Sequence, residues 1–157
     1  DFFKKHKKVI VKPINGYSGN EVILLKTFNA TIINKYLKKH NHVIFQKFLP
    51  QISKGDRRVF IINGKIKGSI SRVPKKNSIL SNMSKGAVAK FNKLTSKEIK
   101  ISKEAAILLK NNNIYFAGVD FVQGQLIGDI NVTSPTGLAT HYSLTGINLA
   151  NYFWDNI

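Results

Sequence analysis

The stretch RRVFIINGKIKGSISRV, residues 57–73, decides the fold of this chain. Two runs with β-branched residues flank Asn63-Gly64, a pair preferred in the type I′ turn of a two-residue β-hairpin. The stretch therefore predicts two antiparallel strands joined by a tight turn. Hairpins of this kind with helices between them indicate an α+β fold, in which helices pack on a mostly antiparallel sheet.

The rest of the chain extends this pattern on both sides of the hairpin. Short runs of β-branched residues predict further strands over 7–14, 21–26, 42–49, 114–122 and 125–132. Apolar spacing predicts helices over 29–40, from the capping box Thr95-x-x-Glu98 to the Asn run at 111–113, and over 146–157. Residues 74–94 are polar and weakly periodic, which predicts a long mobile loop. We expect two small lobes, residues 1–49 and 50–157.

The chain of 157 residues is strongly basic, with 25 Lys and Arg against 8 Asp and Glu and a formal net charge of +17. Only three of the basic residues are Arg, and the Lys are spread along the chain. Nucleic-acid readers rely on Arg for bidentate contacts to bases and phosphates. The composition therefore disfavours a nucleic-acid partner and leaves a weak, salt-sensitive affinity for anions.

Composition also bears on metal sites and on location. The chain has no Cys, and its four His are too scattered to favour a zinc site. No apolar run reaches the roughly 20 residues that a membrane span requires. Residues 1–8 lack the apolar core of a signal peptide. We therefore expect no membrane contact and a cytoplasmic location.

Three polar residues late in the chain could form a site of oxygen ligands. Asp120 and Asp129 lie in two neighbouring predicted strands, where they can face each other across the pair. Asn131 faces the same way as Asp129, because side chains alternate along a strand. Oxygen ligands of this kind suit Mg²⁺ that bridges phosphates. The residues alone leave a second interpretation equally open, in which these are acids at a solvated sheet edge.

Other residues could bind the phosphates that accompany such a metal. Lys12 lies in the first predicted strand, and a glycine-bearing loop follows it, formed by Gly16, Tyr17, Ser18 and Gly19. Backbone N–H groups of such a loop can approach a phosphate closely. Arg58 and Arg72 lie on the two arms of the hairpin, where a planar guanidinium can bind phosphate with two hydrogen bonds. An ordinary turn and exposed strand side chains are the alternative interpretation.

Several stretches taken together resemble the ATP-grasp part of bacterial glutathione synthetase. They are VKPINGYSG (11–19), QKFLPQISKGDRRV (46–59), NGKIKGSISRVP (63–74), FAGVDFV (116–122) and INVTSPTG (130–137). The resemblance implies an ATP-grasp fold, in which two α+β lobes grip ATP, and a ligase that uses Mg²⁺, with Mn²⁺ as a substitute. It also implies the reaction: ATP phosphorylates the carboxylate of γ-glutamylcysteine, and the amine of glycine then displaces phosphate.

The resemblance implies a role for each matching residue. The residues that would bind the nucleotide are Lys12, Gly16, Tyr17, Ser18, Gly19, Gln46, Lys47, Phe48, Leu49 and Asp56. Among these, residues 46–49 would form the adenine hinge and Asp56 would lie near the ribose. Arg58 and Arg72 would be catalytic and would stabilise the transferring phosphoryl group. The metal ligands would be Asp120, Asp129 and Asn131, and the residues at the peptide substrate would be Asn82, Ser134, Pro135, Thr136 and Gly137.

The chain departs from the family pattern at three places. Asp129 stands where the family usually has Glu, so the side chain is one methylene shorter. The spacing from Asp120 to Asn131 is one residue longer, which we ascribe to the turn at 123–125. The loop LSNMSKGAVAK (80–90) has lost the Arg that the family carries there. These changes fall at the expected metal and substrate sites.

The resemblance begins midway along the family sequence. We therefore expect this chain to carry the nucleotide site, with the substrate domain outside it. The expected partners are small molecules, namely ATP, γ-glutamylcysteine and glycine, and the parent enzyme is expected to be a homo-oligomer. Two alternatives stay open: another ATP-grasp ligase that joins a carboxylate to an amine, or a non-catalytic basic module that binds nucleotides or nucleic acid.

Overall fold

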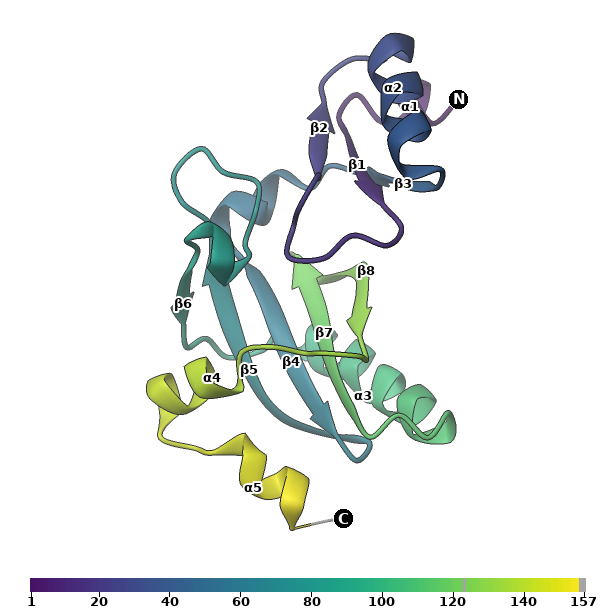
Figure 1. Ribbon diagram of the computed structural model, residues 1–157. Coiled ribbons are helices and arrows are strands. Elements are labelled where there is room, and N and C mark those ends of the chain that lie inside the picture. Colours follow the sequence, from purple (N-terminus) through teal and green to yellow (C-terminus); the bar gives the residue numbers. More distant parts are fainter. Residues whose placement is uncertain (123, 156–157) are drawn as a thin grey trace. The chain divides into compact units, whose positions relative to one another are not determined.

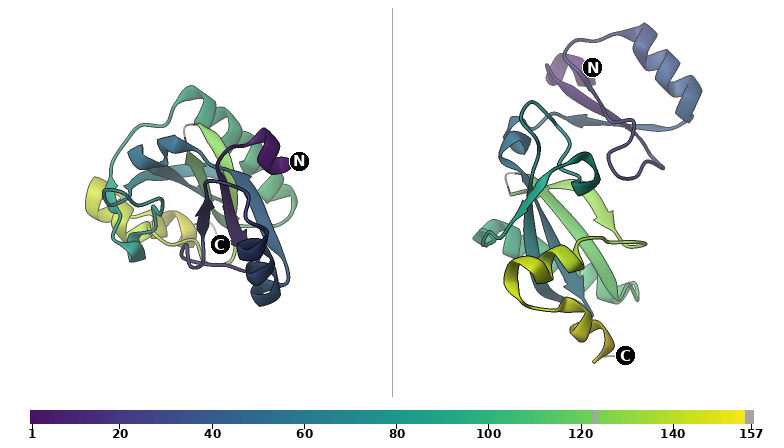
Figure 2. Two further views of the ribbon diagram at one scale, coloured as in Figure 1. Left: turned by 90° about the horizontal axis from the view of Figure 1, so that it is seen from above. Right: turned by 60° about the vertical axis from the view of Figure 1, so that its left-hand side comes forward.

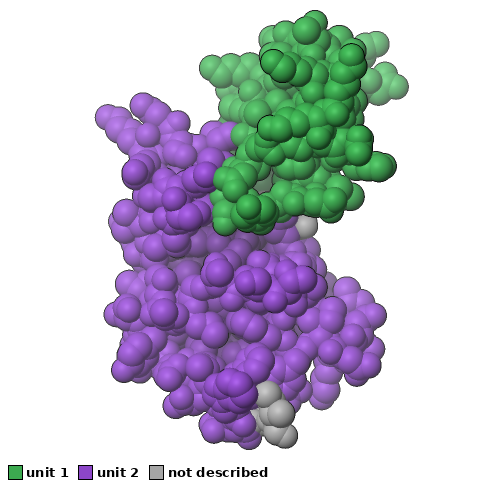
Figure 3. Space-filling model, viewed as in Figure 1, with its two compact units in different colours: residues 1–50 green, residues 51–157 purple. Residues whose placement is uncertain are grey.

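The computed structural model describes residues 1–122 and 124–155 and shows an α+β chain (Figure 1). The chain divides into two compact units, Asp1–Pro50 and Gln51–Ile157, which Figure 3 colours separately. Each unit is built on its own antiparallel sheet. Among the described residues, none of the helices combines the length and the apolar character needed to cross a membrane.

The first unit is a three-stranded sheet with helices packed against it. Its elements are α1 (Phe2–Lys5), β1 (Val9–Pro13), β2 (Ile23–Leu25), α2 (Ala30–His40) and β3 (Val43–Lys47). The strand order is β2-β1-β3, and both pairs are antiparallel. Val9, Val11 and Leu25 form the core, against which Ile33 and Tyr36 of α2 pack. The predicted helix is confirmed, and the side chain of its N-cap Asn29 accepts a hydrogen bond from Ile32 N.

The second unit is a five-stranded sheet with the order β6-β5-β4-β7-β8. Its strands are β4 (Asp56–Ile62), β5 (Lys65–Val73), β6 (Val88–Lys90), β7 (Phe116–Val122) and β8 (Gln125–Asn131), and all four pairs are antiparallel. Two short 3-10 helices, η1 (Pro50–Lys54) and η2 (Met83–Lys85), precede β4 and β6. The central strands are therefore those of the predicted hairpin and the strand that carries Asp120.

Helices cover the two faces of this second sheet. Figures 1 and 2 show α3 (Ser96–Asn111) on one face and α4 (Leu138–Thr145) and α5 (Leu149–Trp154) on the other. On the α3 face, Ala105, Ala106 and Leu109 of the helix pack with strand residues such as Val59. On the other face, Leu149 of α5 packs with Phe60, Ile62 and Ile70, all at most 1% exposed. Each face thus has its own apolar core.

The strands and helices that the periodic segments predict are confirmed, and the turn of the central hairpin has the expected geometry. Asn63 and Gly64 both have positive φ, 48° and 65°, as the type I′ turn requires. The capping box at Thr95 and Glu98 is also present, with reciprocal side-chain to backbone hydrogen bonds. Local turn and cap chemistry therefore agrees with the final fold at both positions.

Two expectations about local structure differ from the structure, and two short helices were missed. Residues 74–94 are not loop throughout, because η2 and the edge strand β6 lie within them. The predicted strand 42–49 is shorter, since β3 ends at Lys47. The last predicted helix, 146–157, corresponds to α5, and the helix α4 that precedes it was missed. The short helix α1 was missed as well. The ends of two predicted features, Gln123 in the β7–β8 turn and residues 156–157, lie outside the described residues.

The first turn of α3 is bound to the sheet by a charged contact on the face opposite the Asp56 side of β4. Arg57 Nη1 donates to Glu98 Oε1 and Oε2 at 2.7 and 2.6 Å. Burial alone would raise the pKa of Glu98, but hydrogen bonds from Thr95 and Arg57 outweigh it and lower that pKa below 4.5. Arg57 therefore binds a residue of α3, whereas its neighbour Arg58 lies on the other face of β4.

This contact is expected to make the stability of the chain fall in acid. Since the folded pKa of Glu98 lies below 4.5, the unfolded chain binds more protons as pH falls below that value, and the stabilisation is lost as pH passes the folded pKa. The acid limb is the fall in the free energy of unfolding between about pH 7 and pH 3, measured by urea unfolding. Glu98→Gln should make this fall smaller. Glu104→Gln, at an exposed position of the same helix, is the control and should leave the limb unchanged. Equal acid limbs in wild type and Glu98→Gln would contradict this assignment.

Candidate active site

Strand pairing brings four charged side chains together on one face of the second sheet. Asp56 and Arg58 alternate with Arg57 along β4, so they share the face that α4 and α5 cover farther along the strand. In register, Asp56 lies opposite Arg72 of β5, and Arg58 lies opposite Asp120 of β7. All four are between 1% and 6% exposed. Three adjacent strands therefore assemble the two predicted catalytic arginines and two carboxylates into one buried cluster.

Arg58 is held in a fixed plane by contacts on both sides. Its Nε and Nη2 donate to Asp120 Oδ1 and Oδ2, each at 2.8 Å. Its Nη1 donates to the main-chain O and to Oγ1 of Thr136, at 3.1 and 3.2 Å. Because a guanidinium presents its donors in a rigid fork, these contacts define its orientation. Thr136, expected at the substrate end, thus touches a predicted catalytic residue.

Arg72 connects the two carboxylates. Its Nε donates to Asp56 Oδ1 at 2.7 Å, and its Nη2 donates to Asp56 Oδ2 at 2.5 Å. The same Nη2 lies 2.9 Å from Asp120 Oδ2. Asp56 also accepts a hydrogen bond from Ser81 Oγ, at 2.5 Å. Asp56, which was expected near the ribose, is in this structure 1% exposed and binds an arginine and a serine.

The two carboxylates of the cluster respond differently to burial. Burial alone would raise the pKa of Asp120, but the hydrogen bonds and charges of Arg58 and Arg72 outweigh it and lower that pKa. At Asp56 burial prevails and raises the pKa, although Arg72 and Ser81 offset part of its effect. Two arginines and two aspartates balance in charge, so the cluster is neutral while both acids are ionised.

The expected metal ligands are placed differently from one another. Asp120 is buried under the two arginines, whereas Asp129 of β8 is exposed. Asn131 pairs with Gly118, two residues before Asp120, and therefore belongs to the same face. Its Oδ1 accepts hydrogen bonds from Thr133 N and Ser134 N, at 3.3 and 3.0 Å. The structure thus brings Asn131 to the arginine face and forms a local turn with it.

These residues offer a donor set of the chemistry that Mg²⁺ takes. Two carboxylates and one amide supply only oxygen, which suits a hard divalent cation. In the described part of the chain, no group of three His, Cys, Asp or Glu side chains is arranged to hold a metal ion. The carboxylate of Asp120 is shared with the arginines.

The register of β7 and β8 changes next to the cluster. Val119 pairs with Ile130, whereas Phe121 pairs with Leu126, so the irregularity lies between them. The β8 strand therefore has more residues than β7 between these two pairs. This irregularity lies within the stretch from Asp120 to Asn131 whose spacing is one residue longer than in the family pattern. The turn to which this extra length was ascribed includes Gln123, which lies outside the described residues.

The segment after β8 closes over Arg58. A Cβ added at Gly118 would lie 3.1 Å from Pro135 Cβ and 3.4 Å from Arg58 Cδ, so glycine lets this segment approach β7. Ser134 is exposed, and Gly137 is the N-cap of α4 with φ of 113°. Asn82, another residue expected at the substrate, is half-buried at the start of η2 and next to Ser81. The expected substrate residues of this unit thus adjoin the arginine cluster.

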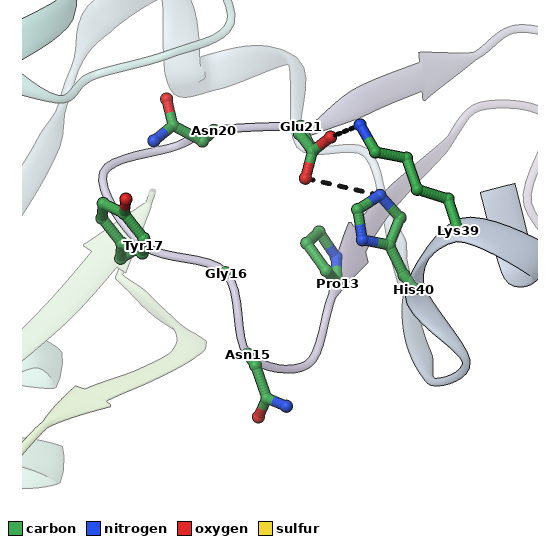
Figure 4. Close-up of a pocket in the computed structure, with 8 residues that line it drawn as sticks. All are labelled: Pro13, Asn15, Gly16, Tyr17, Asn20, Glu21, Lys39 and His40. Carbon is green, nitrogen blue, oxygen red and sulfur yellow. Dashed lines mark hydrogen bonds and ion pairs between the residues drawn. The ribbon is translucent and has the colours of Figure 1, made fainter.

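The glycine loop of the first unit joins β1 to β2 and borders a pocket of about 260 Å³ (Figure 4). Gly16 and Tyr17 line the pocket, and Ser18 and Gly19 have positive φ, 53° and 68°. The far end of the loop is fixed to α2, because Lys39 and His40 pair with the carboxylate of Glu21 (Figure 4). The loop is therefore attached at its ends and projects between them, and Tyr17 is 77% exposed.

The remaining expected nucleotide residues lie on two adjacent strands of the same unit. Lys12 of β1 pairs with Ile44 of β3, and Gln46 of β3 pairs with Ile10. Lys47 is exposed, and Phe48 and Leu49 are half-buried beyond the end of the strand. The main-chain N–H of Phe48 donates to Lys8 O at 3.1 Å, which continues the ladder by one bond. One sheet thus carries Lys12 and the segment expected to be the hinge.

Solved structures show which fold the chain has. The crystal structure of D-cycloserine synthetase DcsG matches 90% of this chain and 54% of its own, with a TM-score of 0.70 and 14% identity. D-alanine–D-alanine ligase from Bacillus anthracis, complexed with ATP, matches 98% of this chain and 52% of its own, with a TM-score of 0.65 and 16% identity. The ATP-grasp ligase PsnB matches 98% of this chain with a TM-score of 0.67 and 15% identity. At these identities the likeness shows the fold alone, and that fold is ATP-grasp.

Sequence comparison then gives the family. The family model described as "Prokaryotic glutathione synthetase, ATP-grasp domain" matches residues 1–146, and the chain belongs to this family. Glutathione synthetase of Bradyrhizobium diazoefficiens is 32% identical over 167 residues, covering 99% of this chain and 51% of that protein. Glutathione synthetase of Prochlorococcus marinus subsp. pastoris is 37% identical over 142 residues, covering 88% and 46%. The chain therefore spans about half the length of the curated relatives it matches.

Proposed function

We propose that this chain is the ATP-binding part of an ATP-dependent ligase that joins γ-glutamylcysteine to glycine and makes glutathione. The observation that carries the proposal is the family match over residues 1–146. The site geometry supports it, because two buried arginines share one sheet face with oxygen donors, as transfer of a phosphoryl group requires. We also propose a cytoplasmic location, where ATP is supplied, and a homo-oligomeric parent enzyme.

In this proposal the residues of the second unit act on the phosphoryl group. Arg58 and Arg72 bind its oxygens while it moves from ATP to the carboxylate of γ-glutamylcysteine, so that an O–P bond of ATP breaks as an acyl phosphate forms. The glycine amine then attacks the acyl carbon and phosphate leaves. Asp120, Asp129 and Asn131 would hold Mg²⁺ or Mn²⁺, which neutralises phosphate charge when bound. Positioning and charge stabilisation, rather than covalent help from the protein, account for the rate.

The residues of the first unit bind the nucleotide in this proposal. Lys12 contacts ATP phosphate, and the loop from Gly16 to Gly19 covers the phosphates with its backbone N–H groups. Residues 46–49 offer backbone groups to adenine between apolar side chains. On the substrate side, Asn82 and the segment 134–137 contact the peptide. The proposal thus gives each half of the chain one part of the ligase reaction.

Release of ADP tests the proposed reaction. The whole natural protein, supplied with ATP and Mg²⁺, should form ADP only when γ-glutamylcysteine is added, and glutathione only when glycine is also present. Both products can be followed by coupled assay and mass spectrometry. ADP formation that responds to neither substrate would contradict the proposal, and stimulation by another carboxylate–amine pair would identify a different ATP-grasp ligase.

The alternative of a nucleic-acid-binding module rests on the net charge of +17 alone. It requires binding to duplex DNA that weakens steeply with salt and is not affected by ATP. Competition between DNA and ATP with Mg²⁺ would instead place any such affinity at the nucleotide site. Fluorescence anisotropy with a labelled duplex separates these outcomes.

A further inference from the structure

Residues 74–87 form the loop between β5 and β6 (Figure 1). This loop is hydrogen-bonded to the arginine cluster through a serine that the motifs do not include. Ser81 lies in this loop and is 7% exposed. Its Oγ donates to Asp56 Oδ2 at 2.5 Å, across 25 residues of sequence. Arg72, the penultimate residue of β5, is the other partner of that carboxylate. The loop therefore leaves the sheet beside Arg72 and returns to its carboxylate partner.

The hydrogen bonds around Asp56 show what this contact does. Asp56 Oδ1 accepts from Arg72 Nε, and Oδ2 accepts from both Arg72 Nη2 and Ser81 Oγ. A carboxylate fixed from a third direction cannot rotate about its bond to Cβ without breaking a short hydrogen bond. Since a guanidinium is planar, a fixed carboxylate also fixes the plane of Arg72. If the loop moved, the carboxylate of Asp56 and with it the plane of the Arg72 guanidinium would therefore change.

The guanidinium of Arg72 has one further nitrogen, Nη1. Its Nε donates to Asp56, and its Nη2 lies within hydrogen-bond distance of both Asp56 and Asp120, so Nη1 is the nitrogen that these two carboxylates do not bind. The direction in which Nη1 points depends on the plane that Asp56 sets. Asn82, proposed to contact the peptide, directly follows Ser81 in the loop. The hydrogen bond from Ser81 to Asp56 thus connects Arg72, which is proposed to bind the phosphoryl group, with the loop that carries Asn82.

We propose that Ser81 is a positioning residue that fastens the 74–87 loop to Asp56 and thereby fixes the orientation of Arg72. Its role in catalysis rests on the proposed function, whereas its role as the anchor of the loop does not. Ser81 itself does not touch the reacting atoms and acts through Asp56. The alternative is a serine that is buried and hydrogen-bonded with no effect on either the loop or the arginine.

Limited proteolysis tests the anchor without any enzyme assay. Lys75, Lys76 and Lys85 are exposed trypsin sites on the two sides of Ser81. Ser81→Ala should raise the rate of cleavage at these lysines about tenfold, since a lost hydrogen bond to a charged group is of that size. Ser84→Ala, at an exposed serine of the same loop, is the matched control and should be cleaved like wild type. Equal cleavage of the two variants would overturn the proposal.

Steady-state kinetics tests the effect on Arg72. In the whole natural protein, Ser81→Ala should lower kcat about tenfold, because one lost charge-assisted hydrogen bond corresponds to that factor. The KM for ATP should stay near the wild-type value, because the substitution does not alter the residues within 1–50 that are proposed to bind ATP. Ser81→Thr keeps the hydroxyl and should restore both kcat and protease resistance. A threonine variant that is as labile and slow as the alanine variant would overturn the proposal. If Ser81→Ala proves too unstable to purify, Ser81→Thr is compared with wild type, and faster cleavage with a lower kcat would overturn the proposal.

The two tests separate the anchor from the proposed function. Faster cleavage of Ser81→Ala in a protein that makes no glutathione supports Ser81 as the anchor and contradicts the proposed ligase. Normal ligase activity with wild-type cleavage and wild-type kcat in Ser81→Ala supports the ligase and overturns the anchor.

Discussion

Arg58→Lys is expected to lower the turnover of the whole protein about 10²–10³-fold, the cost of removing one donor that stabilises transition-state charge. Lysine keeps the positive charge but has a single nitrogen, so it cannot reach both oxygens of Asp120 and also Thr136, as the guanidinium does. The phosphoryl group would then meet a cation without a fixed direction. Single-turnover ADP formation, with the melting temperature measured in parallel, records the effect.

Arg57→Lys provides the matched control for this experiment. Arg57 precedes Arg58 in the chain but lies on the opposite face, where it binds Glu98 of α3. Lysine at this position should change thermal stability but leave turnover close to wild type. Similar turnover for both lysine variants would show that Arg58 has no special role in the reaction.

Asp120→Asn should have the largest effect on folding, a loss of about 3–5 kcal/mol in the free energy of unfolding. Asp120 is 5% exposed and bound to both Arg58 and Arg72, so its neutralisation leaves two buried guanidinium groups with one carboxylate fewer. Urea unfolding followed by circular dichroism measures this loss. A variant as stable as wild type would mean that water or a shift of the strands already compensates these charges.

Asp129→Asn is the companion variant, at an exposed carboxylate proposed for the metal. Its free energy of unfolding should stay close to wild type, while the Mg²⁺ concentration at half-maximal rate rises about tenfold or more. A Mn²⁺ titration followed by electron paramagnetic resonance in the presence of ATP gives a second readout of the same loss. Equal losses of stability in the two variants would indicate a structural role for Asp129 as well.

Periodicity and turn chemistry were sufficient to predict most of the strands and helices. The Asn63-Gly64 turn and the Thr95 capping box are local, so the residues that determine them are neighbours in sequence. Helix α4, LATHYSLT, was missed because its Thr, Tyr, His and Ser are weak helix formers and it lacks a clear apolar stripe. The strand β6 has three residues and depends on pairing with β5, which no local pattern reveals.

Alternation could predict which residues share a face of a strand, but not which strands are neighbours. Arg58 and Arg72 were identified as a pair from their hairpin, yet the position of Asp120 opposite Arg58 follows from the order β5-β4-β7. Sequence spacing related Asp120 instead to Asp129 and a metal. Ser81 had no signal at all, because its partner Asp56 lies 25 residues away and the bond depends on the path of a loop.

The adjacency of Arg57 and Arg58 has a consequence for how this sequence can evolve. Side chains alternate, so a single inserted or deleted residue early in β4 would exchange the two arginines between the face covered by α3 and the face that carries the charged cluster. Length changes in this central strand should therefore be absent from functional variants. The sheet edge is different, since β8 already accommodates extra residues opposite β7. Gains and losses of single residues should accordingly accumulate at the margin of the sheet, and substitutions alone in its middle.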